Sequence, residues 1–178
     1  MLRGEDYLAS DPELIALRDR AALLTERFNA TSEVERDERG RLLRELLGEV
    51  GDGVDIRPGF RCDYGSHIAI GARTFVNYDC VMLDVAPIRI GSACQLGPKV
   101  QLLTATHPLD PARRAEGWES GVPITLGDNV WLGGGVIVGP GVTIGSDTVV
   151  GAGSVVTGDL PARVVAVGSP ARVVRQLA

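Results

Sequence analysis

Between Leu126 and Val156 an aliphatic residue stands at every sixth position, and polar or small residues fill most places between. A glycine directly follows five of these six aliphatic residues. Six residues turn an α-helix by about 600°, so the aliphatic positions would not form a stripe along it. One long strand would need alternation and would far exceed the usual strand length. The period therefore predicts short flat segments separated by turns, in a solenoid whose stacked coils bury one another's apolar sides.

The same period is present earlier in the chain, although it is less regular there. We expect a β-helix of coils over residues 51–168. A run without period, residues 104–122, interrupts it and is rich in proline, glycine and charge. Leu102 and Leu126 are 24 residues apart, four sixes, so the run is expected to leave a continuous scaffold and return to it. A loop of this length in a compact domain is usually functional or disordered.

Two amphipathic segments precede the coils. Residues 11–29 carry apolar side chains at helical spacing, with Asp11 as a capping residue and Pro12 in the first turn. A second helix is expected over about residues 33–47, where a Ser-x-x-Glu pair forms a capping box. Together they predict an N-terminal helical hairpin over residues 1–50 that covers the open end of the solenoid and its unpaired strand edges.

The end of the chain predicts one more element. Residues 169–178 are expected to form a short C-terminal helix, with Ser169 as its cap and Pro170 in its first turn. Helical cap, coils and closing helix form one structural unit of a mainly β fold.

Composition agrees with narrow aliphatic coils and limits the partners. The 178 residues suffice for one domain, and they are 44% hydrophobic but only 4% aromatic. The net charge of −5 gives no basic field for nucleic acid. The first ten residues are charged and lack an apolar signal region, and no apolar stretch is long enough to span a membrane. We expect a soluble cytoplasmic protein.

The three cysteines are Cys62, Cys80 and Cys94. An odd number without a signal region argues against a disulfide framework. The repeat places each at a small inward position, so we interpret them as buried hydrophobic residues. Cys62 and Cys80 are eighteen residues apart, which predicts that they stack one coil apart if three hexads make a coil.

Two histidines are candidates for chemistry. His67 lies at the entry to a repeat, and we favour a packing or solvated side chain. His107 lies in the aperiodic run, and a histidine in a loop on a rigid scaffold suits a general base, with a solvated side chain as the equal alternative. With two histidines and no compact Cys/His pair, we predict no metal site.

Seven segments spread over almost the whole chain resemble the maltose and galactoside O-acetyltransferase family, which consists of hexapeptide-repeat sugar acetyltransferases. The leader, CDYG, MLD and ATHPLDP motifs in combination are far more specific than the hexads. The segments are RGEDYLASDPEL (3–14), FRCDYG (60–65), CVMLDVAPIRIG (80–91), TATHPLDP (104–111), PITLGDNVWLGG (123–134), VVGAGSVV (149–156) and VGSPARVVR (167–175).

The resemblance implies a left-handed parallel β-helix and transfer of an acetyl group from acetyl-CoA to a sugar hydroxyl, in a homotrimer with sites between subunits. His107 matches the family's catalytic histidine, which can take the hydroxyl proton during direct attack on the thioester, without a covalent intermediate. Asn77 matches the site asparagine, which can bind the acceptor or the developing oxyanion. From the residues alone, Asn77 is a turn residue of a hexad.

The resemblance also implies the acceptor pocket. Asp63 and Asp84 match positions that line it, and Glu119 is expected to orient the His107 imidazole or contact the sugar. The family's acceptor-side aspartate in the leader falls near Ala9, and the adjacent aspartates leave open which one reaches the sugar. Without the resemblance, Asp63 and Asp84 are equally well solvated turn residues.

For the CoA site, the resemblance implies small residues along the coils, an aromatic wall and basic residues for phosphates. One departure is Gly158, where the family commonly has a lysine; weaker CoA binding or compensation by Arg163 would follow. The matching positions are Trp131, Gly134, Ala152, Thr157, Gly158, Arg172 and Arg175.

Other functions compete with this one. A hexapeptide acetyltransferase for a galactoside, serine, antibiotic or nodulation-factor acceptor is the first alternative. A metal-dependent hydratase of the γ-carbonic anhydrase kind needs three histidine ligands, and the chain has two. A non-catalytic trimeric scaffold is disfavoured by His107 and Asn77.

Overall fold

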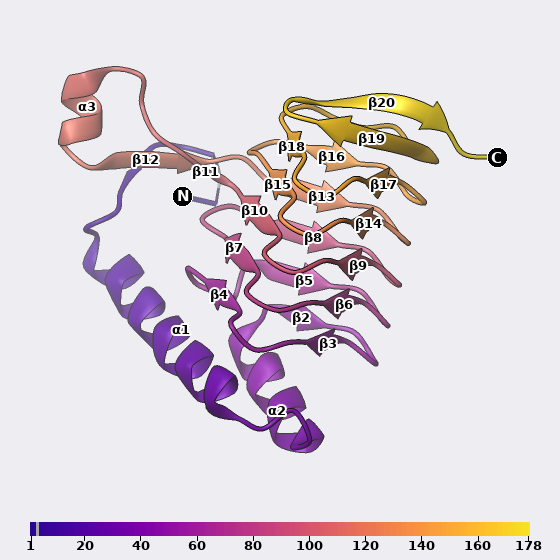
Figure 1. Cartoon of the computed structure of the whole chain (residues 1–178). Coiled ribbons are helices and arrows are strands. Elements are labelled where there is room, and N and C mark those ends of the chain that lie inside the picture. Colours follow the sequence, from indigo (N-terminus) through magenta and orange to yellow (C-terminus); the bar gives the residue numbers. More distant parts are fainter. Residues whose placement is uncertain (3) are drawn as a thin grey trace.

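A computed structural model describes residues 1–2 and 4–178; Arg3, the first residue of the leader motif, lies outside the described residues. The coils form a parallel β-solenoid with three faces (Figure 1). The first face contains β2 (Glu49–Val50), β5 (Ile68–Ile70), β8 (Ile88–Ile90), β13 (Ile124–Leu126) and β16 (Thr143–Ile144). The second contains β3 (Asp55–Ile56), β6 (Phe75–Val76), β9 (Gln95–Leu96), β14 (Trp131–Leu132), β17 (Val149–Val150), β19 (Val164–Gly168) and β20 (Ala171–Gln176). The third contains β4 (Arg61–Cys62), β7 (Val81–Leu83), β10 (Gln101–Leu103), β15 (Ile137–Val138) and β18 (Val155–Val156).

The hexad pattern is confirmed as the inward side of these strands. Ile56 pairs with Val76, and Val76 pairs with Leu96 in the following coil. Further along the stack, Leu132 pairs with Val150. All of these side chains are buried in one continuous core. Glycine after the aliphatic residue lets coils approach closely, since a Cβ on Gly133 would lie 2.5 Å from the Ala152 nitrogen.

The coil length differs from the expectation at the first coils. Cys62 stacks on Met82, twenty residues later, so the predicted stacking of Cys62 on Cys80 is wrong. The turns after the third face, such as residues 63–67, hold two extra residues that the six-residue period does not contain. Cys80 and Cys94 are fully buried and Cys62 is half-buried, all three as free thiols.

Two edges of the solenoid matter for function. The asparagine edge joins the second face to the third, through residues 57–60, 77–80, 97–100, 133–136 and 151–154. The histidine edge joins the third face to the first face of the next coil, through residues 63–67, 84–87, 104–123, 139–142 and 157–159. The third face lies between the two edges.

The helical hairpin covers one end of the solenoid, as predicted (Figure 1). Helix α1 (Pro12–Ala30) begins with Asp11 accepting the Glu13 N–H at 2.9 Å. Helix α2 (Arg36–Leu46) begins three residues later than expected. The Glu35 carboxylate accepts the Ser32 N–H at 2.7 Å, which fixes residues 32–35 as a turn before the helix.

The aperiodic run is an ordered arm that leaves the histidine edge. It consists of β11 (Ala105–Thr106), α3 (Pro111–Ala115) and β12 (Trp118–Gly121). Strand β1 (Tyr7–Leu8) from the leader pairs with β12, so a three-stranded sheet ties the arm to the N-terminus.

The predicted C-terminal helix is wrong. Residues 171–176 form β20, which pairs antiparallel with β19. Gly168 has a φ of 104° and stands where the hairpin turns, and the valines on both sides favour extended backbone. Ser169 and Pro170 therefore belong to a tight turn and do not begin a helix.

Among the described residues, no helix is long and apolar enough to cross a membrane.

Candidate active site

The sheet of the arm brings Tyr7 and Glu119 together, and His107 directly follows its strand β11. Tyr7 pairs with Glu119, and Thr106 pairs with Ser120. β11 ends at Thr106, and its register, extended by one residue, would set His107 opposite Glu119. The Tyr7 hydroxyl donates to Glu119 Oε2 at 2.9 Å, and Tyr7 is buried while His107 is exposed.

Asp63 brings a further carboxylate near Glu119. Burial, and after it the nearby charges of Asp84 and Glu119, together raise its pKa to about 6, while Arg18 opposes them. The candidate acceptor residues Asp63 and Glu119 are therefore close enough for their charges to interact.

Asp84 has a different environment. Its side chain is fully buried, and its carboxylate accepts the N–H groups of Asp63, Tyr64 and His67 at 2.9–3.2 Å. The carboxylate thus holds the turn that presents Asp63. His67 Nδ1 lies 2.7 Å from the Asp84 carbonyl oxygen, which confirms its interpretation as a packing residue.

Asn77 lies on the asparagine edge together with two of the candidate CoA residues. Its N–H donates to Leu96 O, and one coil further Gly97 N–H donates to Leu132 O, which stacks Asn77 below the turn that contains Gly134. Ala152 follows in the next coil, since Gly133 N–H donates to Val150 O. Small residues therefore form a track of accessible backbone above Asn77.

Thr157 and Gly158 lie on the other edge, the one from which the arm leaves. Both are exposed. Four of the sequence-predicted CoA residues are thus divided between the two edges of the third face within one chain.

His107 and Asn77 also lie on different edges: Asn77 on the asparagine edge, and His107 in the arm that leaves the histidine edge. Gly97 on the asparagine edge and Thr104 on the histidine edge are seven residues apart in one coil, a span on the order of 20 Å for extended backbone. Hydrogen-bonded catalytic partners lie about 3 Å apart. Within one chain, the width of the third face therefore separates Asn77 from the edge at which the arm with His107 leaves the solenoid.

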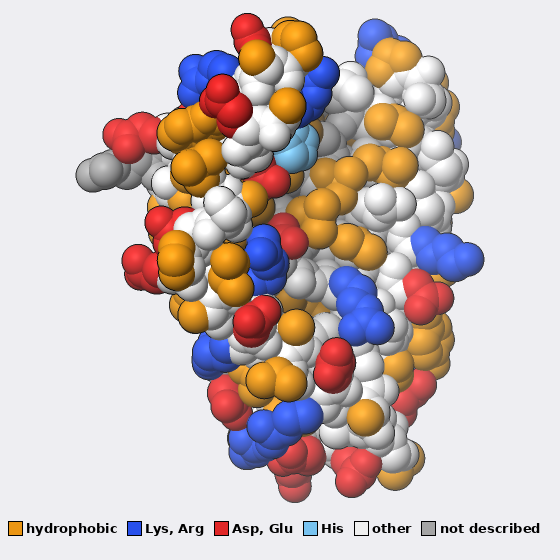
Figure 2. All heavy atoms as spheres, turned by 90° about the vertical axis from the view of Figure 1, so that its left-hand side faces the viewer, with side chains coloured by type: hydrophobic (Ala, Val, Ile, Leu, Met, Phe, Trp, Pro, Cys, Tyr) orange, Lys and Arg blue, Asp and Glu red, His pale blue; other side chains and the backbone are white. Residues whose placement is uncertain are grey.

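The outer side of the third face, between the edges, is mostly apolar, with Gln101 and the exposed Arg61 as its polar residues. Figure 2 shows hydrophobic side chains lining the hollow beside the arm and α1. The half-buried outward residues of this face are Val81, Leu83, Gln101, Leu103, Ile137 and Val155.

Trp131 stands on the outer side of the second face. It pairs with Val149, which pairs with Val165, which is opposite Arg175 on β20, so these four side chains form one ladder. Trp131 is 55% exposed and lines a groove of about 480 Å³. The groove is lined by Gln95, Asn129, Trp131, Asp147, Val149, Arg163, Leu177 and Ala178.

The remaining basic candidates differ from one another. Arg172 is exposed on β20, opposite Val167, and donates to the Ala171 carbonyl. Arg163 lies between the first and second faces and donates to the Ala178 carbonyl. It is therefore on a different edge from Gly158, and it is not a direct replacement for a side chain at that position within one chain.

The leader aspartates are both engaged. Asp11 caps α1, and Asp6 pairs with Arg113 of the arm at 2.8 Å. The leader residue that reaches the candidate site is Tyr7, which sequence reasoning missed. Its spacing in the leader carries no periodic signal, and only the pairing of β1 with β12 reveals its contact with Glu119.

The described residues contain no group of three or more His, Cys, Asp or Glu side chains placed to hold a metal ion. The cysteine thiols are poor nucleophiles here, because burial raises the pKa of Cys62 to about 12 and that of Cys80 to about 11.

Comparisons with known proteins agree with these elements. Residues 1–51 match the maltose acetyltransferase hexapeptide capping motif, and residues 123–158 match the bacterial transferase hexapeptide family of six repeats. Nodulation protein L of Rhizobium meliloti is 51% identical over 97% of this chain and 94% of its own length.

Two solved structures are similar over nearly the whole chain. A maltose O-acetyltransferase from Clostridium difficile 630 is 48% identical, with a TM-score of 0.98 over 99% of this chain and 95% of its own. The hexapeptide-repeat acetyltransferase VCA0836 from Vibrio cholerae O1 biovar eltor, complexed with acetyl coenzyme A, is 42% identical, with a TM-score of 0.93 over 100% of this chain and 96% of its own. The chain therefore belongs to the family of acetyl-CoA-dependent hexapeptide-repeat acetyltransferases that includes the maltose O-acetyltransferases.

Proposed function

We propose that this protein transfers the acetyl group of acetyl-CoA to a hydroxyl of a maltose-like or glucose-like sugar. The observation that carries the proposal is the Tyr7–Glu119 hydrogen bond in the arm, with His107 directly after β11 of the same sheet and the Asp63 carboxylate close enough to feel the charge of Glu119. An exposed imidazole next to carboxylates suits a polyol acceptor, because carboxylates accept several hydroxyl hydrogen bonds and the imidazole takes one proton. The similarity to a maltose O-acetyltransferase supports the acceptor class.

The proposed reaction is a direct transfer. His107 removes the proton of the sugar hydroxyl as its oxygen attacks the thioester carbonyl carbon. The tetrahedral intermediate collapses, the C–S bond breaks, and the imidazolium returns the proton to the CoA sulfur. No covalent enzyme intermediate is needed, which agrees with buried thiols of raised pKa.

Asn77 supplies a donor for the oxyanion in this scheme. Its Oδ1 accepts the N–H of Tyr78 at 2.8 Å, which leaves the Nδ2 hydrogens to point elsewhere. A side-chain amide is a known oxyanion donor, and it is most effective when it is held in place before the charge develops.

The separation of His107 from Asn77 supports a homotrimer. In a cyclic assembly, the histidine edge of one copy can face the asparagine edge of the next, which completes each site from two chains. The mostly apolar outer side of the third face, between the edges, is a surface that such packing would bury. We propose that the subunit interface covers this face.

The residues of the chain also suit a binding site for CoA. The exposed backbone near Gly134 and Ala152 can pair with the pantetheine amides, while Thr157 and Gly158 border the other side of the cleft between subunits. Trp131 offers an aromatic wall, and the exposed Arg172 and Arg175 offer positive charge for phosphates. Three free cysteines and the need for acetyl-CoA are consistent with a cytoplasmic protein.

Asp63 predicts how acceptor binding depends on pH. Its carboxyl has a pKa of about 6, so it becomes protonated as the pH falls from 7.5 to 5 and loses capacity to accept hydroxyl bonds. We expect the KM for the sugar to rise over this range in the wild type. Asp63→Asn should have a raised KM that stays flat with pH, and an unchanged slope in this variant would contradict the assignment.

The same pKa has a consequence for stability. Because the folded protein raises the pKa of Asp63 above its usual 3.8, the protonated form is favoured in the fold. This contribution is present below about pH 4 and is lost as the pH rises through about 6. Urea unfolding of the wild type and of Asp63→Asn between pH 4 and pH 7 measures it.

Gly158 predicts a change in CoA affinity. A Cβ at this position would meet no atom within 4 Å, so a lysine can be introduced without strain. Near a CoA phosphate, an exposed ammonium adds about 0.2–1 kcal/mol, so Gly158→Lys should lower the KM for acetyl-CoA by about 1.4- to 5-fold. Gly158→Gln is the neutral control, and equal KM values for both variants would remove position 158 from the CoA site.

A thiol-release assay with acetyl-CoA across glucose, maltose, galactosides, serine and chloramphenicol tests the proposed function. Release is expected with maltose or glucose and not with serine or chloramphenicol. A preference for galactosides, serine or an antibiotic would make the protein another acetyltransferase of this family. Tight binding of acetyl-CoA without transfer to any acceptor would favour a non-catalytic scaffold.

A further inference from the structure

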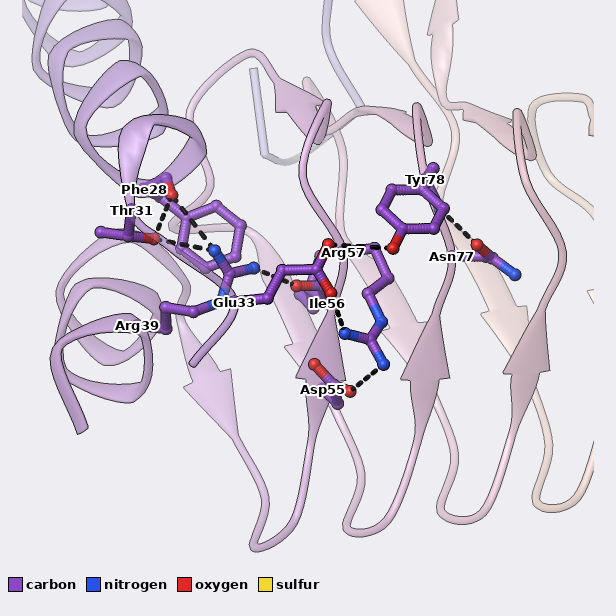
Figure 3. A network of polar contacts seen from close by, with 9 residues as sticks. All are labelled: Phe28, Thr31, Glu33, Arg39, Asp55, Ile56, Arg57, Asn77 and Tyr78. Carbon is purple, nitrogen blue, oxygen red and sulfur yellow. Dashed lines mark hydrogen bonds and ion pairs between the residues drawn. The ribbon is translucent and has the colours of Figure 1, made fainter. Parts of the chain in front are cut away.

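Glu33, in the turn between the two helices of the cap, contacts the asparagine edge (Figure 3). Its Oε1 accepts the hydroxyl of Tyr78 at 2.9 Å, and its Oε2 accepts a hydrogen bond from Arg57. Arg57 also lies 3.5 Å from Asp55, so the carboxylates of Glu33 and Asp55 both hold the Arg57 guanidinium. The cap is therefore connected to the solenoid by polar contacts as well as by the apolar core.

The cap itself is firmly seated at this place. Arg39 of α2 is buried and donates to the Phe28 and Ile56 carbonyl oxygens and to Thr31 Oγ1 (Figure 3). Its guanidinium also lies 4.2 Å from the centre of the Phe28 ring. The end of α1, the start of the coils and the turn that carries Glu33 are thus locked together.

Tyr78 transmits this anchoring to Asn77. Its backbone N–H donates to Asn77 Oδ1, so any shift of residue 78 turns the Asn77 amide. Residue 79, the next in the turn, has a φ of 60°, and Lys99 at the same position of the next coil has a φ of 61°, so the backbone of this turn has the regular form of the edge. The Tyr78 carbonyl accepts the Lys99 N–H at 2.8 Å, which holds the backbone, while the side chain of this 44% exposed residue is held by its hydroxyl contact with Glu33.

We propose that Tyr78 and Glu33 are positioning residues for Asn77, and that the helical cap thereby sets the direction of the oxyanion donor. This inference rests on the proposed function, because it assigns a role within the same site. The Asn77 Nδ2 hydrogens have no partner among the described protein groups, which leaves them available for the substrate. Loss of the Tyr78–Glu33 contact lets the turn move and lowers the population of productive amide orientations.

Tyr78→Phe removes one oxygen atom and is the direct test. We expect kcat to fall by about three- to tenfold, as for loss of one hydrogen bond, with the KM for acetyl-CoA unchanged. Glu33→Gln should retain part of the activity, because its amide oxygen still accepts the hydroxyl. Glu38→Gln breaks an exposed ion pair with Arg41 on the same cap and is the matched control, which should keep full kcat.

A double-mutant cycle separates positioning from general damage. In the Asn77→Asp background, which lacks the donor, Tyr78→Phe should cause no further loss of kcat. An equal loss in both backgrounds, or full kcat for Tyr78→Phe alone, would overturn the proposal.

A structural readout keeps this inference distinct from the proposed function. The ¹⁵N-labelled side-chain amide of Asn77, identified by its absence in Asn77→Asp, should shift and broaden in Tyr78→Phe and stay unchanged in Glu38→Gln. An unchanged amide signal in Tyr78→Phe would reject positioning even if no sugar were acetylated. A shifted signal with no acetyl transfer by the wild type would reject the proposed function alone.

Discussion

Replacing His107 with alanine is expected to lower kcat by about 10²- to 10⁴-fold, the range for loss of a general acid–base group. A sugar hydroxyl is a poor nucleophile while it keeps its proton, and no other imidazole is exposed beside the acceptor carboxylates, since His67 is packed against Asp84. Affinity for acetyl-CoA should be unchanged, because the histidine acts on the acceptor.

The control for His107→Ala is Leu109→Ala in the same arm. Leu109 is 95% exposed, so its truncation perturbs the arm surface without removing a contact in the core. It should keep wild-type kcat. Steady-state kinetics and acetyl-CoA titration of both variants measure the effect, and substantial kcat in His107→Ala would disprove the general-base role.

Replacing Asn77 with aspartate is expected to lower kcat by about 10²- to 10³-fold, as for loss of an oxyanion donor. Aspartate keeps the oxygen that accepts the Tyr78 N–H, so the turn should stay intact. It removes the Nδ2 donor and places a negative charge where the oxyanion forms. The change therefore acts mainly on the transition state.

Asn77→Ala separates the two effects in that substitution. It removes the donor without adding charge, so it should lose less activity than Asn77→Asp while the turn becomes looser. Single-turnover rates at saturating acetyl-CoA measure the chemical step for both. If either variant keeps wild-type rates, Asn77 does not stabilise the oxyanion.

The repeating part of the fold could be predicted because its physics is local. Each hexad carries its own inward aliphatic residue and turn, so the period alone indicates stacked coils from Leu126 to Val156. The caps of α1 were also readable, since Asp11 and Pro12 act on adjacent backbone. The arm was visible as an interruption of the period.

The C-terminal hairpin could not be predicted from such local signals. Ser169 and Pro170 resemble a helix start, and the decision between helix and strand depends on whether β19 is available as a partner. Pairing with a distant strand overrides a local capping signal. For the same reason the contact of Tyr7 with Glu119 could not be predicted, because it depends on the pairing of β1 with the distant strand β12.

The candidate site shows what a family motif adds and what it omits. The resemblance grouped Asp63 and Asp84 as pocket residues, but only the structure distinguishes their environments: the first is half-buried near Glu119, and the second is buried and holds three backbone N–H groups. Sequence spacing also could not reveal that His107 and Asn77 lie on different edges, because edges depend on where the coils turn.

Mixed trimers test whether His107 of one copy and Asn77 of another complete each site. His107→Ala and Asn77→Asp chains with different tags are co-expressed, and assemblies that carry both tags are isolated. Each mixed trimer then contains one intact pairing among three sites, so about one third of wild-type kcat per trimer should return. Activity that stays at the level of the separate variants would contradict a site shared between copies.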